Sequence, residues 1–143
     1  MAKTICKILG VVFILVGILG FLAPGMLGFH LNLAHNLIHL VSGAVALYFG
    51  FSATLSAARL FCIVSGVVYG LLGLLGFLLG GGAAHGVGGV PAAHHGATDS
   101  SLWTVLPGSL ELASVDHIFH LLLAAVFLIG GFLTRADIER AVD

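Results

Sequence analysis

The chain has 143 residues, of which 59% are hydrophobic and only 8% are Asp, Glu, Lys or Arg, and its formal net charge is −1. Its mean hydropathy is +1.19. This composition excludes an ordinary soluble domain and indicates an integral membrane protein, and the lack of excess positive charge excludes a nucleic-acid partner.

Four apolar segments follow one another along the chain and predict four membrane spans. A span needs about 20 residues to cross roughly 30 Å of hydrocarbon. The four segments cover about residues 8–23, 33–51, 60–79 and 112–133. We therefore predict an all-α membrane protein, with residues 1–143 forming a single four-transmembrane-helix bundle in the lipid bilayer. A Gly/His-rich outer loop at 80–111 precedes the last span.

The basic residues predict the orientation of the spans. All five flank the apolar segments on the same side of a four-span chain: Lys3, Lys7, Arg59, Arg135 and Arg140. Cytoplasmic loops carry the excess of Lys and Arg in multi-pass proteins. We therefore expect both termini in the cytoplasm and the loops at 24–32 and 80–111 outside.

The first and third spans resemble each other. ICKILGVVFILVGILGFL at 5–22 and FCIVSGVVYGLLGLLGFL at 61–78 are identical at ten of eighteen positions, with a constant offset of 56. HNLIHL at 35–40 aligns with DHIFHL at 116–121 in the other two spans, with an offset of 81. This pattern predicts two tandem helical hairpins, a parallel pseudo-repeat about an axis along the membrane normal. Since the first span has a counterpart within the chain, we do not expect its cleavage as a signal peptide.

Small residues are concentrated on one face of the first and third spans. Such faces let helix backbones approach closely in lipid. The residues concerned are Gly10, Gly17, Gly20, Gly66, Gly70, Gly73, Gly76 and Gly80. We expect these faces to form seams within the chain, and a homo-oligomer through the glycine faces is the less favoured alternative.

Polar side chains interrupt the second and fourth spans near their predicted outer ends. On each helix they share an arc of about 100–120° with small residues, so they should point into the bundle. The predicted cluster comprises Asn32, His35, Asn36, His39, Asp116, His117 and His120. We place His39 and His120 at its centre, with Asp116, one helical turn before His120, accepting the imidazole N–H.

Several functions are compatible with this cluster. We favour a structural role, in which the polar groups bond one another between helices. One alternative is a transition-metal site for Zn or Cu, with His35, His39, Asp116 and His120 as ligands. The loop histidines His85, His94 and His95 would add capacity to bind such a metal.

Two further alternatives use the same polar cluster. The histidines of two parallel spans resemble axial ligands of a non-covalently held haem. A proton or ion relay is the remaining alternative, because ionisable groups within a membrane are functional candidates. The sequence contains no catalytic motif, so we do not expect an enzyme.

Four segments carry a resemblance to a known family. GVVFILVGILGFLAPG, LAHNLIHLVSG, AARLFCIVSGVVYGLLGLLGF and SVDHIFHLLLA follow in this order. The chain resembles, over about residues 8–133, the bacterial four-span membrane proteins known as domain of unknown function 4383. The resemblance implies a multi-pass protein of the bacterial inner (plasma) membrane and gives no activity. It singles out His35, Asn36, His39, Asp116 and His120, while His117 stands where the family usually has Asn.

Overall fold

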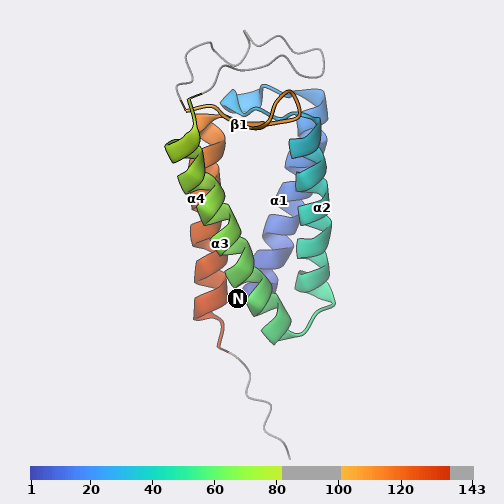
Figure 1. The fold of residues 1–143 in the computed structure, drawn as a ribbon. Helices are drawn as coiled ribbons and strands as arrows, with labels where there is room; N and C mark the ends of the chain where they lie inside the picture. The colour runs from blue at the N-terminus through green and yellow to red at the C-terminus, as the bar shows by residue number, and fades with distance from the viewer. Residues whose placement is uncertain (82–100, 136–143) are drawn as a thin grey trace, which may run out of the picture.

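Four long helices dominate the computed structural model, which describes residues 1–81 and 101–135 (Figure 1). They are α1 (Ala2–Leu22), α2 (Leu33–Phe51), α3 (Leu55–Leu79) and α4 (Ser114–Leu133). Each is long and apolar enough to cross a membrane, which confirms the predicted all-α four-helix bundle. α1 begins six residues and α3 five residues before the apolar segment that predicted it.

Polar side chains fix where three of the helices begin. The Asn32 side chain accepts a hydrogen bond from the backbone N–H of His35 at 3.0 Å, and Thr54 accepts one from Ala57 at 3.2 Å. These bonds satisfy N–H groups that the first helical turn leaves without an intrahelical partner. At α4 the carboxylate of Asp116 accepts from the backbone N–H of Ala113 at 2.7 Å.

Glycines join α1 to α2 and α3 to α4. A Cβ atom on Gly17 would lie 2.9 Å from the Leu40 side chain, and one on Gly73 would lie 2.7 Å from that of Leu121. Gly73 follows Gly17 by 56 positions and Leu121 follows Leu40 by 81, the two offsets of the sequence comparison. Both of these glycines therefore lie in seams within the chain.

We expect Gly73→Ala to destabilise the protein by about 1–3 kcal/mol, the usual cost of overpacking a close contact. The new methyl would also lie 2.9 Å from the backbone oxygen of His117, which has little freedom to move. Gly70→Ala is the matched control on the same helix, because its Cβ would meet Ala124 at an ordinary 3.5 Å. Unfolding in detergent, followed by circular dichroism, measures both; equal effects of the two substitutions would contradict the packing of this seam.

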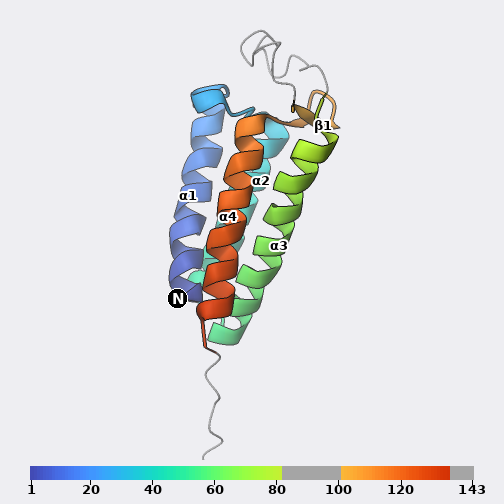
Figure 2. The same cartoon turned by 90° about the vertical axis from the view of Figure 1, so that its left-hand side faces the viewer.

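The two helix pairs meet near the N-terminal ends of α1 and α3. The Sγ atoms of Cys6 and Cys62 lie 3.5 Å apart, and the ring of Phe13 stacks on that of Tyr69 at 5.5 Å. Both pairs join positions that are 56 residues apart. The buried cluster at this contact consists of Ala2, Cys6, Leu9, Phe13, Ala58, Cys62 and Phe127. Figure 2 shows α4 alongside both α1 and α3.

A short antiparallel hairpin covers the opposite end of the bundle, where the helix pairs are farther apart (Figure 1). It consists of β1 (Trp103–Leu106) and β2 (Leu110–Leu112), with Gly108 at φ +69° in the turn. The sequence indicated only an outer loop in this region. The predicted loop histidines His85, His94 and His95 lie outside the described residues.

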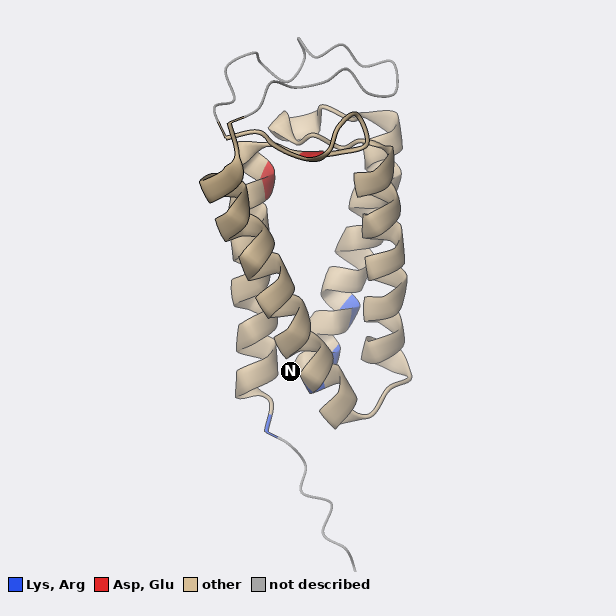
Figure 3. Ribbon diagram, viewed as in Figure 1, with Lys and Arg blue, Asp and Glu red and all other residues tan. Residues whose placement is uncertain are grey.

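Charged residues separate between the two ends of the bundle (Figure 3). In the described residues, Lys and Arg lie near the end that is opposite the hairpin, and Asp and Glu lie near the hairpin. Arg59 donates from Nε to the backbone oxygen of Gly131 at 3.0 Å, and Lys7 lies over the ring of Phe51 at 4.5 Å from its centre.

Candidate functional site

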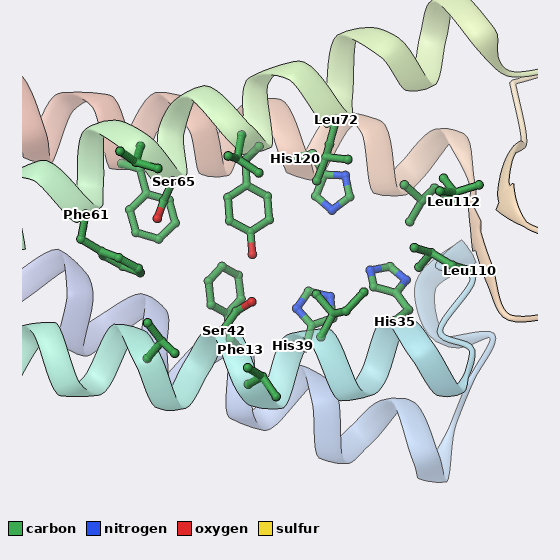
Figure 4. Close-up of a pocket in the computed structure, with 18 residues that line it drawn as sticks. Phe13, His35, His39, Ser42, Phe61, Ser65, Leu72, Leu110, Leu112 and His120 are labelled. Carbon is green, nitrogen blue, oxygen red and sulfur yellow. The ribbon is translucent and has the colours of Figure 1, made fainter.

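A cavity of about 330 Å³ lies between α2 and α3 (Figure 4). Its deep wall includes Phe13 from α1 and Phe127 from α4, and both rings are buried. The hairpin closes its outer end through Val105, Leu110 and Leu112. Exposed valines from the two helices line its rim: Val41, Val45, Val64 and Val68. The cavity is therefore covered at the end of the bundle and open at its side.

Three histidines gather at the hairpin end of this cavity. His35 and His39 come from successive turns of α2, and their ring centres are 4.6 Å apart. The ring of His120, from α4, lies 6.2 Å from that of His35. Figure 4 shows the two α2 side chains directed toward His120. The structure thus brings together three of the seven residues of the predicted cluster.

The three imidazoles differ in their hydrogen bonds. Nδ1 of His35 bonds to the backbone oxygen of His30 at 3.1 Å. Within residues 1–81 and 101–135, by contrast, the side chains of His39 and His120 form no hydrogen bond, and Nδ1 of each is buried without a partner. These two side chains are only 8% and 5% exposed. A buried polar group left without a partner costs about 1–3 kcal/mol. Each of these imidazoles is therefore available to form a hydrogen bond with a ligand.

Aromatic rings pack against the histidines and against one another. The ring of Tyr69 lies 5.5 Å from that of His120 and is nearly parallel to that of Phe127, at an interplanar angle of 7°. Phe13 lies 5.5 Å from the ring of His39. Ser42, about one turn of α2 beyond His39, and Tyr69 of α3 also line the cavity.

Two residues of the predicted cluster lie in the helix seams instead. Asn36 packs against Gly20 of α1, and its Nδ2 donates to the backbone oxygen of Leu31 at 3.4 Å. His117 packs against Gly76 of α3, and its Nε2 lies 2.8 Å from the backbone oxygen of Ser101. Neither residue lines the cavity. Asn36 joins α2 to α1, and His117 joins α4 to α3.

Asp116 does not orient His120, in contrast to the role predicted for it. Oδ2 of Asp116 accepts from the backbone N–H of Ala113 at 2.7 Å and from that of His30 at 3.3 Å. The third residue of a helix is well placed to reach back to the N-cap backbone, and this local geometry takes precedence over the residue one turn later.

Replacing Asp116 tests how much these two hydrogen bonds contribute to stability. We expect Asp116→Ala to lower the free energy of unfolding by about 1–3 kcal/mol, because two buried N–H groups lose their acceptor. Asp116→Asn retains an acceptor oxygen and should be affected much less. Thermal unfolding in detergent tests the pair; an equal loss in both variants would show that the charge, and not the cap, is what stabilises this end.

A contact between a histidine and a carboxylate, which the sequence did not indicate, fastens the hairpin to the helices. Nε2 of His30 lies 3.3 Å from Oε2 of Glu111, and both side chains are buried. The other carboxylate oxygen accepts from the backbone N–H of Gly108 at 3.0 Å. The Asn32 side chain donates to the backbone oxygen of Glu111 at 3.4 Å. No motif links these residues, because they come from two connections that are distant in the sequence.

The geometry does not support the predicted metal site. Within residues 1–81 and 101–135, no group of three or more His, Cys, Asp or Glu side chains is placed to hold a metal ion. The physical reason is that Asp116 faces the helix end, while His35, His39 and His120 occupy the cavity wall.

Four membrane-length helices around a side-opening cavity define the class of the protein as a multi-pass integral membrane protein. The chain belongs to the family "Domain of unknown function (DUF4383)", whose model matches residues 3–97. The matched part contains α1, α2 and α3, and therefore His35 and His39, but ends before α4. No curated protein and no solved structure matches the chain.

Proposed function

We propose that this protein binds a lipid-soluble molecule in the cavity between α2 and α3, with His39 and His120 at the polar end of the site. The observation that carries the proposal is that, among the residues that the structure describes, these two buried imidazoles have no hydrogen-bond partner at the wall of a mostly apolar cavity. The cavity volume of about 330 Å³ falls at the lower end of the range typical of small-molecule sites.

The rim of the cavity supports a ligand that comes from the bilayer. Val41 of α2 is 63% exposed and Val64 of α3 is 52% exposed, and both line the cavity. Val41 lies eight residues after the start of α2, about 12 Å along the helix at 1.5 Å per residue. A helix of a multi-pass protein faces hydrocarbon at that depth, so the mouth would open to lipid and not to water.

The structural role favoured from the sequence fits other members of the cluster better. Asn32, Asn36, Asp116 and His117 form hydrogen bonds that join helices or cap them. The side chains of His39 and His120 form no hydrogen bonds within the described residues, whereas stabilising contacts between helices by polar groups require such bonds. The polar cluster therefore divides into groups that hold the fold together and groups that are available to a ligand.

The orientation of the protein is part of the proposal. We place both termini in the cytoplasm and the hairpin at the outer face of the bacterial inner membrane. The separation of Lys and Arg from the hairpin end supports this orientation. An origin of the two helix pairs by duplication is also part of the proposal. It is supported by the equivalent contacts of Gly17 and Gly73 and by the contact between Cys6 and Cys62.

Photolabelling tests the binding site directly. Protein in lipid nanodiscs would be irradiated with adamantyl diazirine, a small membrane-soluble probe, and the labelled residues mapped by mass spectrometry. We expect saturable labelling of residues that line the cavity. Ser65→Phe, which places a ring in the cavity wall, should abolish that labelling, since Ser65 is buried there.

Val67→Phe is the matched control, because Val67 is 51% exposed and does not line the cavity. It should leave the saturable labelling unchanged. Non-saturable labelling spread evenly over the lipid-facing surfaces of all four helices would contradict a ligand cavity.

A further inference from the structure

We infer that the ligand is a single-chain alcohol, whose hydroxyl group binds between the imidazoles of His35, His39 and His120. This inference rests on the proposed function and adds the chemical class of the ligand. It follows from the hydrogen-bonding state of the three rings, from their separation, and from the apolar mouth of the cavity.

His35 presents a hydrogen-bond acceptor to the cavity. Its Nδ1 lies 3.1 Å from the backbone oxygen of His30, and a carbonyl oxygen can only accept. Nδ1 therefore carries the proton, and in a neutral imidazole the other nitrogen, Nε2, is left with a lone pair. Because His35 lines the cavity, a ligand that satisfies this nitrogen must itself be a donor. A ketone, an ester or an ether has no hydrogen to donate.

His39 and His120 favour the opposite arrangement. Nδ1 of each ring is buried without a hydrogen-bond partner among the residues that the structure describes. Buried N–H groups that lack an acceptor are rarer in proteins than buried acceptors that lack a donor, so the proton is better placed on Nε2. Because Nδ1 is buried, Nε2 is also the nitrogen that a ligand in the cavity can reach. Both rings therefore supply a donor.

A hydroxyl group matches one acceptor and two donors. It has one hydrogen to donate and two lone pairs that accept. Two nitrogens bonded to the same oxygen each lie about 3 Å from it, so they can be up to roughly 6 Å apart. The ring centres of His35 and His39 are 4.6 Å apart, and those of His35 and His120 are 6.2 Å apart. Since both α2 side chains are directed toward His120 (Figure 4), we place the hydroxyl between the rings.

The rest of the ligand must be apolar. Exposed valines line the mouth of the cavity, and carrying an ion past them would incur a large desolvation cost. A fatty acid is ionised at neutral pH, and its carboxylate has no hydrogen to donate to His35. The cavity volume of about 330 Å³ suits the head and the first part of one chain better than two chains. The remainder of the chain would leave through the valine rim into the bilayer.

Three probes with the same chain length test the hydroxyl group. Purified protein in detergent would be titrated with 1-dodecanol, with 1-methoxydodecane, whose oxygen accepts but has no hydrogen to donate, and with dodecanoate, whose head is charged. We expect 1-dodecanol to raise the thermal midpoint saturably. The other two probes should bind about tenfold more weakly, since each lacks the hydrogen bond to His35, a loss of about 1.4 kcal/mol.

Two variants assign the hydrogen bonds to their rings. His120→Leu should weaken the binding of 1-dodecanol about tenfold, because one donor to the hydroxyl oxygen is lost. His35→Leu should bind 1-dodecanol and 1-methoxydodecane equally, because the acceptor that distinguishes them is gone. Val67→Phe, which lies outside the cavity, should bind 1-dodecanol like the unaltered protein.

The outcomes distinguish this inference from the proposed function. An equal or larger shift with 1-methoxydodecane or dodecanoate would overturn the alcohol while leaving the lipid-soluble ligand in place. A lack of any shift with 1-dodecanol, together with saturable diazirine labelling, would also overturn the alcohol alone. Failure of every probe, the diazirine included, would overturn both.

Discussion

Glu111→Ala is expected to lower the free energy of unfolding by about 2–5 kcal/mol, because two donors lose their acceptor and each buried group left without a partner costs about 1–3 kcal/mol. Glu111 is 0% exposed, and its carboxylate contacts both the His30 imidazole and the backbone N–H of Gly108. The loss should be larger than for any other residue of the hairpin, because this side chain fastens the hairpin to the connection between α1 and α2.

Titration with sodium dodecyl sulfate, monitored by circular dichroism, measures this loss. Leu106→Ala in the same hairpin is the control, since Leu106 is 54% exposed and should change stability little. Glu111→Gln keeps an acceptor for Gly108 and should fall between the two. A Glu111→Ala variant as stable as Leu106→Ala would contradict the anchoring role of the pair.

His39→Leu is expected to make the ligand-free protein more stable by about 1–3 kcal/mol, because it removes a buried polar group that has no partner. The same substitution should weaken the stabilisation that a ligand provides, because one of the two imidazoles available to the ligand is lost. Leu has a volume close to that of His, so the cavity wall stays filled. His120→Leu should behave in the same way, because His120 lies at the same end of the cavity.

His117→Leu provides the contrast on α4. Its Nε2 is bonded to the backbone oxygen of Ser101, so the substitution should destabilise the protein. Thermal unfolding in detergent without ligand compares the three variants. A loss of stability in His39→Leu and His120→Leu similar to that in His117→Leu would favour the structural role for all of these histidines.

The number of helices and the seams between them were predictable from the sequence. Four apolar runs of membrane length leave little alternative to four spans. The seams followed from small residues such as Gly17 and Gly73, because in lipid close helix contact depends on the absence of side chains. These features are local in the sequence, and periodicity is sufficient to find them.

The assignment of individual polar residues was less predictable. His117 and His120 are three positions apart, so they point only about 60° from each other around α4. Their angular positions around the helix place both histidines inside the bundle. These positions do not show which histidine faces α3 and which faces the cavity. That choice depends on how far the helix pairs diverge beneath the hairpin, a tertiary feature without a local signal.

Asp116 and the hairpin illustrate a second difficulty. The carboxylate of Asp116 had two possible partners within one turn, and the unpaired N–H of Ala113 at the helix start was the one it bonded. The pairing of His30 with Glu111 joins two loops that are distant in the sequence, and it becomes visible only when the hairpin folds over the bundle.

The nitrogen-15 NMR shifts of the histidine rings provide the most direct measurement of the central claim. Protein labelled at its imidazole nitrogens would be studied in nanodiscs before and after addition of 1-dodecanol, an apolar chain with one hydroxyl group, with signals assigned from His39→Leu, His120→Leu and His117→Leu. We predict that the signals of His39 and His120 shift as their rings gain a hydrogen bond, while that of His117 stays unchanged. Unchanged signals from His39 and His120 at saturating dodecanol, or equal shifts of all histidines, would contradict a site centred on these two residues.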